Sequence, residues 1–448
     1  MTFISTKFVS AAALAAAMLA SGASFAQEAA PEAAAAPVDT AAYSETVETI
    51  LADPKFDAAV QYLDANYDQM ITEFEELTEI PSGPFMEEAI SARYAELLEA
   101  SGLTEVKVDE EGNAIGVWKG TESDGKFLVV SAHLDTVFPE GTDVTIEWKG
   151  TEAHAPGVRD DKMSTAIILA YARAMKDAGI ETKDDILFVG TVGEEGPGDL
   201  RGVRYLFNEG EYADKIKGFF SVEGGSAGSA TVGGTGSVRY RVHFKGPGGH
   251  SFGAFGLVNP AYALADFMTS FSQIQVPTEP KTTHSVGILA GGTSVNSIPF
   301  SVSADIDMRS NEPAELDKVH ERMKVIAEQA AANENARRSV AEGPITVELE
   351  QIGLRPAGKT AEDTEIFQLT KAAFEATIGD FKGEGFGSTD SNMPMSLGIP
   401  ALTIGANSGI GGRGHSLDEW LETAKDKTLP NMKATLAVVL ANAGMVAQ

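Results

Sequence analysis

Residues 186–199 read ILFVGTVGEEGPGD, an apolar run that ends in two adjacent glutamates and a Gly-Pro-Gly turn. The run at 186–192 is rich in β-branched and aromatic residues, which predicts a buried strand. Two neighbouring carboxylates at the end of such a strand repel each other and are costly to remove from water. We therefore expect Glu194 and Glu195 either to lie in water at a loop tip or to lie beside a cation.

Strands and helices alternate around this stretch. Apolar runs predict strands at 114–120, 126–135, 186–192 and 218–224. The spacing of apolar residues predicts a helix over 162–178, and earlier helices over 44–79, with a break or a start at Pro54, and over 86–100. Apolar runs that are buried on both faces and separated by helices are typical of a mostly parallel sheet. The sequence therefore predicts an α/β fold.

A chain of 448 residues is too long for one ordinary core, and the pattern changes near Thr231. The run 236–246 alternates polar and apolar residues, as a half-exposed antiparallel strand does. A helix, two strands, a long charged helix over 313–338 and another strand follow, and this β-α-β-β-α-β order predicts an inserted α+β domain. The α/β pattern resumes after Leu354. The predicted boundaries are 44–232 and 353–448 for the two parts of a catalytic domain and 233–352 for the insertion.

The N-terminus predicts export. Residues 1–26 carry Lys7, then an apolar stretch, then small residues, which is a secretory signal pattern with cleavage after Ala26. Residues 27–43 form a low-complexity Ala/Pro/Glu segment, predicted to be a disordered tether. No later run reaches the roughly 18 apolar residues of a membrane span. We expect a periplasmic or secreted protein that is not membrane-bound after cleavage.

Charge and cysteine content narrow the possible partners and ligands. The 65 acidic residues outnumber the 34 basic ones, for a net charge of −31, which disfavours nucleic acid and anionic membranes as partners. The chain has no cysteine, so it forms no disulfide and offers no thiolate ligand. Any metal ion must be held by histidine, aspartate and glutamate side chains.

Such side chains stand where several predicted strands end. They are His133 and Asp135 after one strand, Glu194 and Glu195 after another, Glu223 after a third, Asp160 before the 162–178 helix and His415 in a late Gly-rich loop. Ligand sites in open α/β sheets lie beyond the carboxyl ends of the strands, so these groups are expected to converge. Asp135 lies two residues after His133, on the same face of an extended chain, and can hydrogen-bond the imidazole and fix its tautomer. Two histidines with several carboxylates exceed the needs of one zinc ion and match two ions about 3.5–4 Å apart, bridged by a carboxylate.

The motifs SAHLDTV, GVRDDK, VGEEG, VEGG and RGHS, in this order, resemble the metal-site motifs of the M20 family of metallopeptidases. The resemblance extends from about Glu73 to the C-terminus and includes the insertion. The segment GSTDSNMPMSLGIPALTIGANSG, followed by RGHSLDEW, resembles the tripeptidase T-like branch. One departure is the Met-Ser-Thr sequence after Lys162, where many members have small glycines.

The resemblance implies roles for the metal-capable residues. The implied ligands of two divalent ions are His133, Asp160, Glu195, Glu223 and His415. Asp160 would bridge the ions, with Glu195 on one ion and Glu223 on the other. Glu194 would be the general base that takes a proton from a metal-activated water and later protonates the leaving amine. Asp135 would support catalysis as the partner of His133. Zinc is the expected metal, with cobalt or manganese as alternatives.

The resemblance also implies that the inserted domain mediates homodimerisation. His250, in GPGGHS, would reach the active site of the partner subunit and stabilise the tetrahedral oxyanion. Asn296 and Arg309 match substrate-binding positions. The planar fork of an arginine suits the terminal carboxylate of a peptide.

These features predict an exported, metal-dependent peptidase that hydrolyses short peptides as a tripeptidase or aminopeptidase does. An M20-type carboxypeptidase or an N-acyl amino acid amidohydrolase is the alternative with the same chemistry. A non-catalytic periplasmic binder of peptide or metal would need no base such as Glu194. A serine hydrolase is a further alternative, because residues 224–228 match G-x-S-x-G and Ser226, Asp390 and His415 follow in suitable order. The sequence after this motif, SATVGGTGSV, does not predict the helix that a nucleophile elbow requires.

Overall fold

The computed structural model describes residues 40–447. The predicted signal segment and most of the predicted tether lie outside the described residues. Helix α1 (Thr40–Leu51) begins inside the predicted tether, so the last residues of that segment are helical. Within 40–447, no helix combines the length and the apolar character of a membrane span.

Nine strands in this part of the chain form one large sheet, in the order β1-β2-β6-β3-β7-β17-β8-β15, with β16 paired to β8. Their bounds are β1 Thr104–Val108, β2 Ala114–Trp118, β3 Phe127–His133, β6 Asp185–Thr191, β7 Ile216–Val222, β8 Ser229–Gly234, β15 Gly358–Lys359, β16 Lys382–Gly387 and β17 Ala401–Ile404. The central pairs β6/β3, β3/β7 and β7/β17 are parallel, whereas β1/β2, β2/β6, β17/β8 and β15/β8 are antiparallel. The predicted mostly parallel α/β sheet is confirmed, with antiparallel pairs toward its edges.

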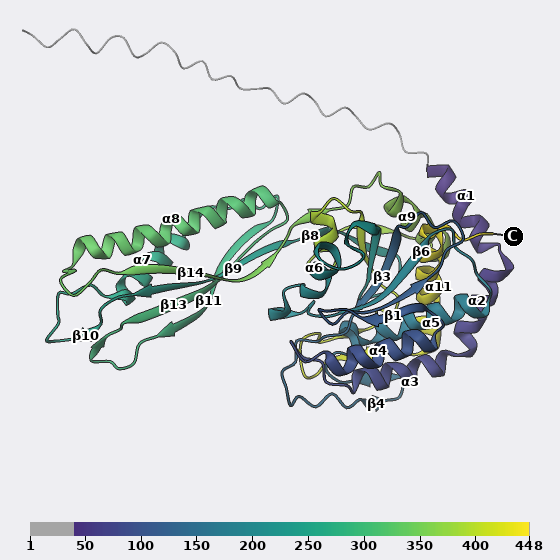
Figure 1. Cartoon of the computed structure of the whole chain (residues 1–448), viewed down its shortest axis with the longest axis horizontal. Helices are drawn as coiled ribbons and strands as arrows, with labels where there is room; N and C mark the ends of the chain where they lie inside the picture. Colours follow the sequence, from purple (N-terminus) through teal and green to yellow (C-terminus); the bar gives the residue numbers. More distant parts are fainter. Residues whose placement is uncertain (1–39, 448) are drawn as a thin grey trace, which may run out of the picture. The chain divides into compact units, whose positions relative to one another are not determined.

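Helices cover both faces of this sheet (Figure 1). Alternate residues of β3 enter two different cores: Leu128 and Val130 pack with the helices of one face, and Phe127 and Val129 with those of the other. The first face carries α1, α2 Pro54–Ala65, α3 Tyr67–Thr78, α4 Glu88–Ala100, α5 Met163–Asp177, α9 Glu365–Thr377 and α11 Lys425–Asn442. The second carries α6 Arg201–Asn208 and α10 Asn392–Ser396. Burial on both faces explains why the central strands are apolar throughout.

The inserted domain has its own antiparallel sheet, in the order β11-β13-β9-β14. Its elements are β9 Gly236–Lys245, α7 Pro260–Phe271, β11 Thr282–Gly291, β13 Ser301–Ser310, α8 Pro313–Arg337 and β14 Thr346–Arg355. This sequence of elements confirms the predicted β-α-β-β-α-β order. Both helices pack on the face that carries Val242 and Ile306 (Figure 1). The opposite face carries ion pairs such as Arg241–Asp305, because alternate strand residues point to opposite sides. A short pair that was not predicted, β10 Gly249–His250 with β12 Ser297–Ile298, accompanies this sheet.

A small four-stranded sheet joins two loops that are distant in sequence. Its order is β18-β19-β5-β4, with bounds β4 Glu147–Lys149, β5 Glu152–His154, β18 Gly411–Gly412 and β19 Trp420–Glu422. The antiparallel pairing of β5 with β19 places His154 opposite Trp420. The turn Val158–Lys162 follows β5, and the loop with His415 precedes β19. The pairing therefore brings Asp160 and His415 to the same place.

Candidate functional site

Three neighbouring strand ends bring the predicted metal ligands together. Strand β3 lies between β6 and β7 and is parallel to both, and its last residue, His133, pairs with Thr191 at the end of β6. Glu194 and Glu195 follow β6, and Glu223 follows β7. The parallel register therefore explains why residues from three separate strands meet at one edge of the sheet.

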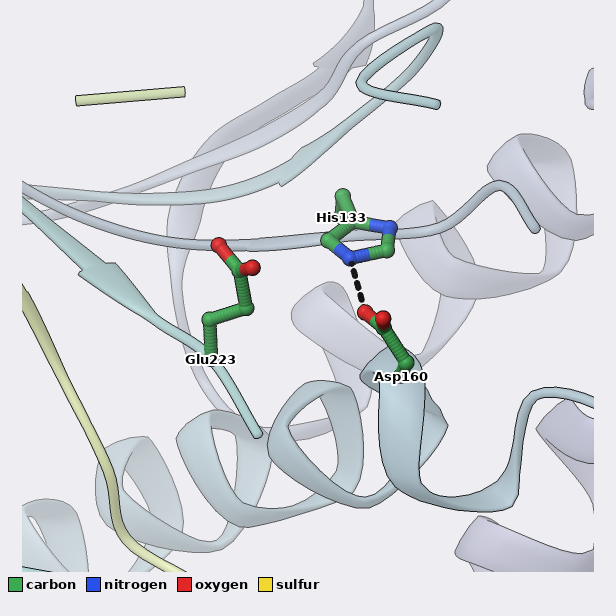
Figure 2. A group of neighbouring side chains, drawn as sticks. All are labelled: His133, Asp160 and Glu223. Carbon is green, nitrogen blue, oxygen red and sulfur yellow. Dashed lines mark hydrogen bonds and ion pairs between the residues drawn. The ribbon is translucent and has the colours of Figure 1, made fainter. Parts of the chain in front are cut away.

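His133 lies at the centre of this group and is buried. Its Nε2 is 2.9 Å from Oδ1 of Asp160, while Glu223 converges on the same space from the end of β7 (Figure 2). Its Nδ1 is 3.0 Å from the main-chain oxygen of Asp135. A carbonyl oxygen only accepts, so this contact places a proton on Nδ1 and leaves Nε2 directed at the cluster. The imidazole thus donates to Asp135, as expected, but to its main-chain oxygen and not to its carboxylate.

The Asp135 carboxylate contributes in a way that the sequence did not predict. It is fully buried, and it accepts hydrogen bonds from the main-chain nitrogens of Glu194, at 3.0 Å, and Glu195, at 2.8 Å. It lies 3.9 Å from Nδ1 of His133, beyond hydrogen-bond distance. The side chain of Asp135 therefore fixes the loop of the two glutamates, and its main chain orients the imidazole.

Asp160 lies between the two histidines. Its Oδ1 contacts His133, and its Oδ2 is 3.2 Å from Nε2 of His415, which is also 2.8 Å from Oε1 of Glu195. Burial opposes ionisation of Asp160, but hydrogen bonds from both imidazoles bring its pKa below the ordinary value. The hydrogen bond to Asp160 is the main cause that raises the pKa of His415 to about 9. The geometry makes Asp160 the link between two halves of the cluster.

Two groups of three potential ligands share Asp160: His133, Asp160 and Glu223 form one, and Asp160, Glu195 and His415 form the other. The ligand atoms of each group lie within 4.8 Å of one another. Histidine and carboxylate donors suit zinc, cobalt and manganese, and two groups that share a carboxylate suit a bridged pair of ions. A third group, His133, Glu194 and Glu195, places Glu194 beside both. The residues present therefore fit a two-metal site.

The electrostatics of the cluster also fit bound cations. Burial raises the pKa of Glu194, of Glu195 and of Glu223, and neighbouring carboxylates raise each of them further. Such a set of acids is costly to keep ionised without added positive charge. A divalent ion is the largest local charge in a site and would remove this cost. The two adjacent glutamates are buried, so the expectation of a solvated loop tip is wrong and that of a neighbouring cation remains.

Arg355, the last residue of β14, is a partner of Glu194 that the sequence did not reveal. Its Nη1 donates to Oε1 of Glu194 at 3.0 Å, and its Nη2 donates to the main-chain oxygen of the same residue. Both side chains are buried. The attraction of this guanidinium opposes the rise in the pKa of Glu194 that burial causes. A lone arginine at the end of a strand carries no sequence signal, because only the tertiary fold brings it to the loop at Glu194.

Glu419 is a second unpredicted residue of the site. Its Oε1 accepts from the main-chain nitrogens of Arg159, at 2.8 Å, and Asp160, at 3.1 Å, and its Oε2 accepts from that of Gly157, at 3.2 Å. Burial raises the pKa of Glu419 to about 7. This carboxylate thus holds the turn that presents Asp160, from the same loop that carries His415. An acid shortly after His415, in RGHSLDEW, was the available signal.

The structure contradicts a serine hydrolase site at Ser226. The segment after Ser226 enters strand β8, not a helix, so the nucleophile elbow is absent. Asp390 accepts a 2.5 Å hydrogen bond from Thr191 Oγ1, and Nε2 of His415 contacts Asp160 and Glu195. Within 40–447 no hydrogen bond joins Ser226, Asp390 and His415.

His250, Asn296 and Arg309 lie in the inserted domain, apart from the ligand cluster. His250 is exposed on β10, and Nδ1 accepts from the main-chain nitrogens of Phe252, at 3.2 Å, and Gly253, at 3.3 Å. The main-chain oxygen of Asn296 accepts from the residue after His250, so these two candidates are neighbours. Nε of Arg309 donates to Asp307 at 2.8 Å. Among the described residues, none of the three contacts a candidate metal ligand through a hydrogen bond or an ion pair.

Arg309 does line a cavity, which shares Ser388 with the surroundings of Arg355. The cavity has a volume of about 370 Å³ and is also lined by Lys281 and Ser388. Ser388 Oγ accepts from Nη1 of Arg355 at 3.1 Å, and Arg355 contacts Glu194. The cavity thus has two cationic side chains, Lys281 and Arg309, and its wall residue Ser388 contacts Arg355.

The chain is similar in sequence or in fold to several known proteins. The chain is 26% identical to carboxypeptidase G2 from Pseudomonas sp. (strain RS-16) over 292 residues, which cover 63% of this chain and 69% of that protein. Aminopeptidase PepT from Bacillus cereus ATCC 10987 shares the fold, with a TM-score of 0.66 and 20% identity over 84% of this chain and 98% of that one. So does YxeP from Bacillus subtilis, a dinuclear metal-binding M20 peptidase, with a TM-score of 0.60 and 19% identity over 85% and 99%.

The family itself follows from the sequence pattern. Residues 129–442, most of the chain, match the pattern of peptidase family M20/M25/M40. This range contains every candidate ligand described above and the inserted domain. The expected family is confirmed: the chain belongs to peptidase family M20/M25/M40 and is a metallopeptidase.

Proposed function

We propose that the protein is an exported peptidase that cleaves short peptides, as tripeptidases and aminopeptidases do. The observation that carries the proposal is the pair of ligand groups that share Asp160, with the buried carboxylate of Glu194 beside them. The likeness to an aminopeptidase and the family membership support peptides as substrates. The signal pattern of residues 1–26 supports export to the periplasm or the medium.

His133 and Glu223 would hold one ion, Glu195 and His415 would hold the other, and Asp160 would bridge them. We propose zinc for both positions, with cobalt or manganese as alternatives that accept the same donors. When bound, such ions polarise a substrate carbonyl and lower the pKa of a water molecule. Asp135 keeps the site in order through the main-chain nitrogens of the two glutamates.

Glu194 is proposed as the general base. Its main chain is held by Asp135 and Arg355, and Arg355 also occupies its Oε1. In the part of the chain that the structure describes, Oε2 has no hydrogen-bond partner, so this oxygen is left to take a proton from the attacking water. The same carboxyl group then protonates the departing amine.

The inserted domain is proposed to complete the site from a second subunit. Large apolar side chains, Phe252, Phe255 and Val295, are exposed around His250 and Asn296, as expected of a surface that another protein covers. His250 would stabilise the oxyanion in the partner subunit, and Asn296 would contact substrate. Arg309 would bind the terminal carboxylate of a peptide in the cavity that it lines.

A panel of di- and tripeptides and N-acyl amino acids, assayed with and without a chelator, tests the function. We expect release of the N-terminal residue from short peptides, loss of turnover with the chelator, and recovery on addition of zinc, cobalt or manganese. Release of the C-terminal residue would favour a carboxypeptidase, which the relative carboxypeptidase G2 makes the second candidate. Preferred cleavage of N-acyl amino acids would identify an amidohydrolase. Tight metal binding without any turnover would overturn the proposal in favour of a binding protein.

A further inference from the structure

We propose that Arg355 is a positioning residue that fixes the Glu194 carboxylate for catalysis and couples it to the strand by which the inserted domain rejoins the catalytic domain. The inference rests on the proposed role of Glu194 as general base. The contacts that carry it are those of Arg355, Asp199 and Leu354.

Arg355 fixes Glu194 at two points. The guanidinium donates to Oε1 of Glu194 at 3.0 Å and, through Nη2, to the main-chain oxygen of Glu194. Nη1 also donates to Oγ of Ser388 at 3.1 Å, which holds the guanidinium in its plane. The fork of an arginine imposes one geometry on its acceptors, whereas a single point charge would not. Glu194 therefore has its nitrogen, its carbonyl oxygen and one carboxylate oxygen occupied, and only Oε2 is left without a partner among residues 40–447.

The backbone at Arg355 is tied to the same loop by a second set of contacts. The main-chain nitrogen of Leu354 lies 3.0 Å from each carboxylate oxygen of Asp199. Arg204 donates to the main-chain oxygens of both Asp199, at 2.9 Å, and Leu354. Asp199 closes the Gly-Pro-Gly turn that begins just after Glu195. The end of β14 and the loop of the base are thus joined at two sites, Leu354–Asp199 and Arg355–Glu194.

This arrangement makes the position of the base depend on the inserted domain. Strand β14 pairs with β9 inside the inserted domain and ends at Arg355. A displacement of the end of β14 displaces the guanidinium and, with it, the carboxylate that it holds. Of the two carboxylate oxygens of Glu194, Arg355 occupies only Oε1, so the contact that orients the base leaves Oε2 open to the attacking water.

The first test compares Arg355→Met and Arg355→Lys with a matched control, Arg241→Met. Arg241 forms a bidentate pair with Asp305 on the sheet of the inserted domain, away from Glu194. We expect R355M to lower kcat by about 100-fold, within the range that proton transfer contributes, with KM and bound metal near the wild-type values. R355K should recover part of kcat, because an ammonium reaches one acceptor but lacks the fork. R241M should keep the wild-type kcat.

Three results would overturn the inference: a wild-type kcat in R355M, a loss confined to KM, or a loss explained by missing metal. R355K keeps a cation in the buried site and carries the test if R355M does not fold. A wild-type enzyme that cleaves no peptide would refute the proposed function instead. The two failures are therefore distinguishable.

The second test addresses the link between the end of β14 and the loop that carries Glu194. Asp199→Asn replaces one of the two oxygens that face the Leu354 nitrogen, and we expect a loss of kcat of about 10-fold or less, without loss of metal. In the R355M background, D199N should cause no further loss of kcat, because the effects of two substitutions that act through one contact are not additive. Additive losses in the double variant would show that Asp199 does not act through Arg355 and would overturn the coupling.

Discussion

The ligand cluster and the inserted domain hold their candidate residues in opposite ways. Glu194 is buried and fixed at its main-chain nitrogen, its carbonyl oxygen and one carboxylate oxygen. His250 is exposed, and its ring contacts only the main-chain nitrogens of Phe252 and Gly253. Groups that are held in place before reaction need no reorganisation during it. One chain thus supplies the whole set of ligand candidates, whereas an exposed histidine needs another surface on which to act.

The largest expected effect concerns the fixed residue, Glu194. Glu194→Gln keeps the size of the side chain and its contact with Arg355 but removes the basic oxygen. We expect turnover to fall by at least about 10²–10⁴-fold, the share that general acid–base catalysis supplies. Metal content, measured on the purified protein, should stay at the wild-type level. The exposed Glu209→Gln serves as the matched control. A Glu194→Gln enzyme with normal turnover would refute the role of the base.

The next largest effect concerns the exposed residue, His250. His250→Ala should lower kcat by about 10²–10³-fold, as the loss of one oxyanion donor does. His243→Ala, a histidine paired with Glu350 on the same domain, is the control. If His250 acts in the partner subunit, mixing E194Q and H250A should restore about a quarter of wild-type activity, since mixed dimers then contain one intact site. Mixtures that stay inactive would place His250 in its own subunit or outside the site.

The contrast also explains which parts of the site were predictable from sequence. The strand pattern alone places four of the ligand candidates at one edge of the sheet, because each ends a strand or follows one within a few residues: His133, Glu194, Glu195 and Glu223. The β-α-β-β-α-β order of the insertion was predictable for the same reason, because each element is encoded locally. The role of Arg355 was not predictable, because its contact with Glu194 depends on where β14, a strand of the inserted domain, ends.

Two further residues, Asp135 and Glu419, also have contacts that the sequence did not predict. The motif around Asp135 indicated that it supports His133, but not that its carboxylate would bind the main chain of the two glutamates. Glu419 stands in the motif RGHSLDEW, yet its function depends on the β5–β19 pairing, which joins chain segments more than 250 residues apart. Local patterns therefore predict ligands better than the residues that hold the ligands.

A smaller effect is expected from one of these supporting residues. Glu419→Gln replaces an acceptor of main-chain N–H groups with an amide NH2, which loosens the turn that carries Asp160. We expect metal affinity to fall by about 10–100-fold, as for other residues that orient ligands. Calorimetric titration of the metal-free protein measures this directly. Asp418→Asn, an exposed neighbour, should leave the affinity unchanged. Wild-type affinity in E419Q would show that the turn holds its shape without this carboxylate.

The smallest effect is a pH dependence of stability that should be strongest in the metal-free protein. Burial raises the pKa of Asp390 to about 6, of Glu419 to about 7 and of Asp161 to about 8. An acid whose pKa is raised by folding contributes stability at low pH that is lost as the pH rises through its folded pKa. His415, raised to about 9 mainly by Asp160, acts in the same direction, because its bound proton is lost at high pH.

The Tm of the metal-free protein should therefore fall by several degrees between about pH 5 and 7, below the range in which the buried Lys162, whose pKa burial lowers to about 7, acts in the opposite direction. Zinc-loaded protein should show a flatter profile, because the divalent charge replaces the protons as the partner of the buried carboxylates. Thermal unfolding of both forms across this range gives the comparison. A metal-free Tm that rises with pH would mean that the buried acids are already compensated within the chain. The case for cations beside Glu194 and Glu195 would then lose its electrostatic basis, even if the ligand geometry were unchanged.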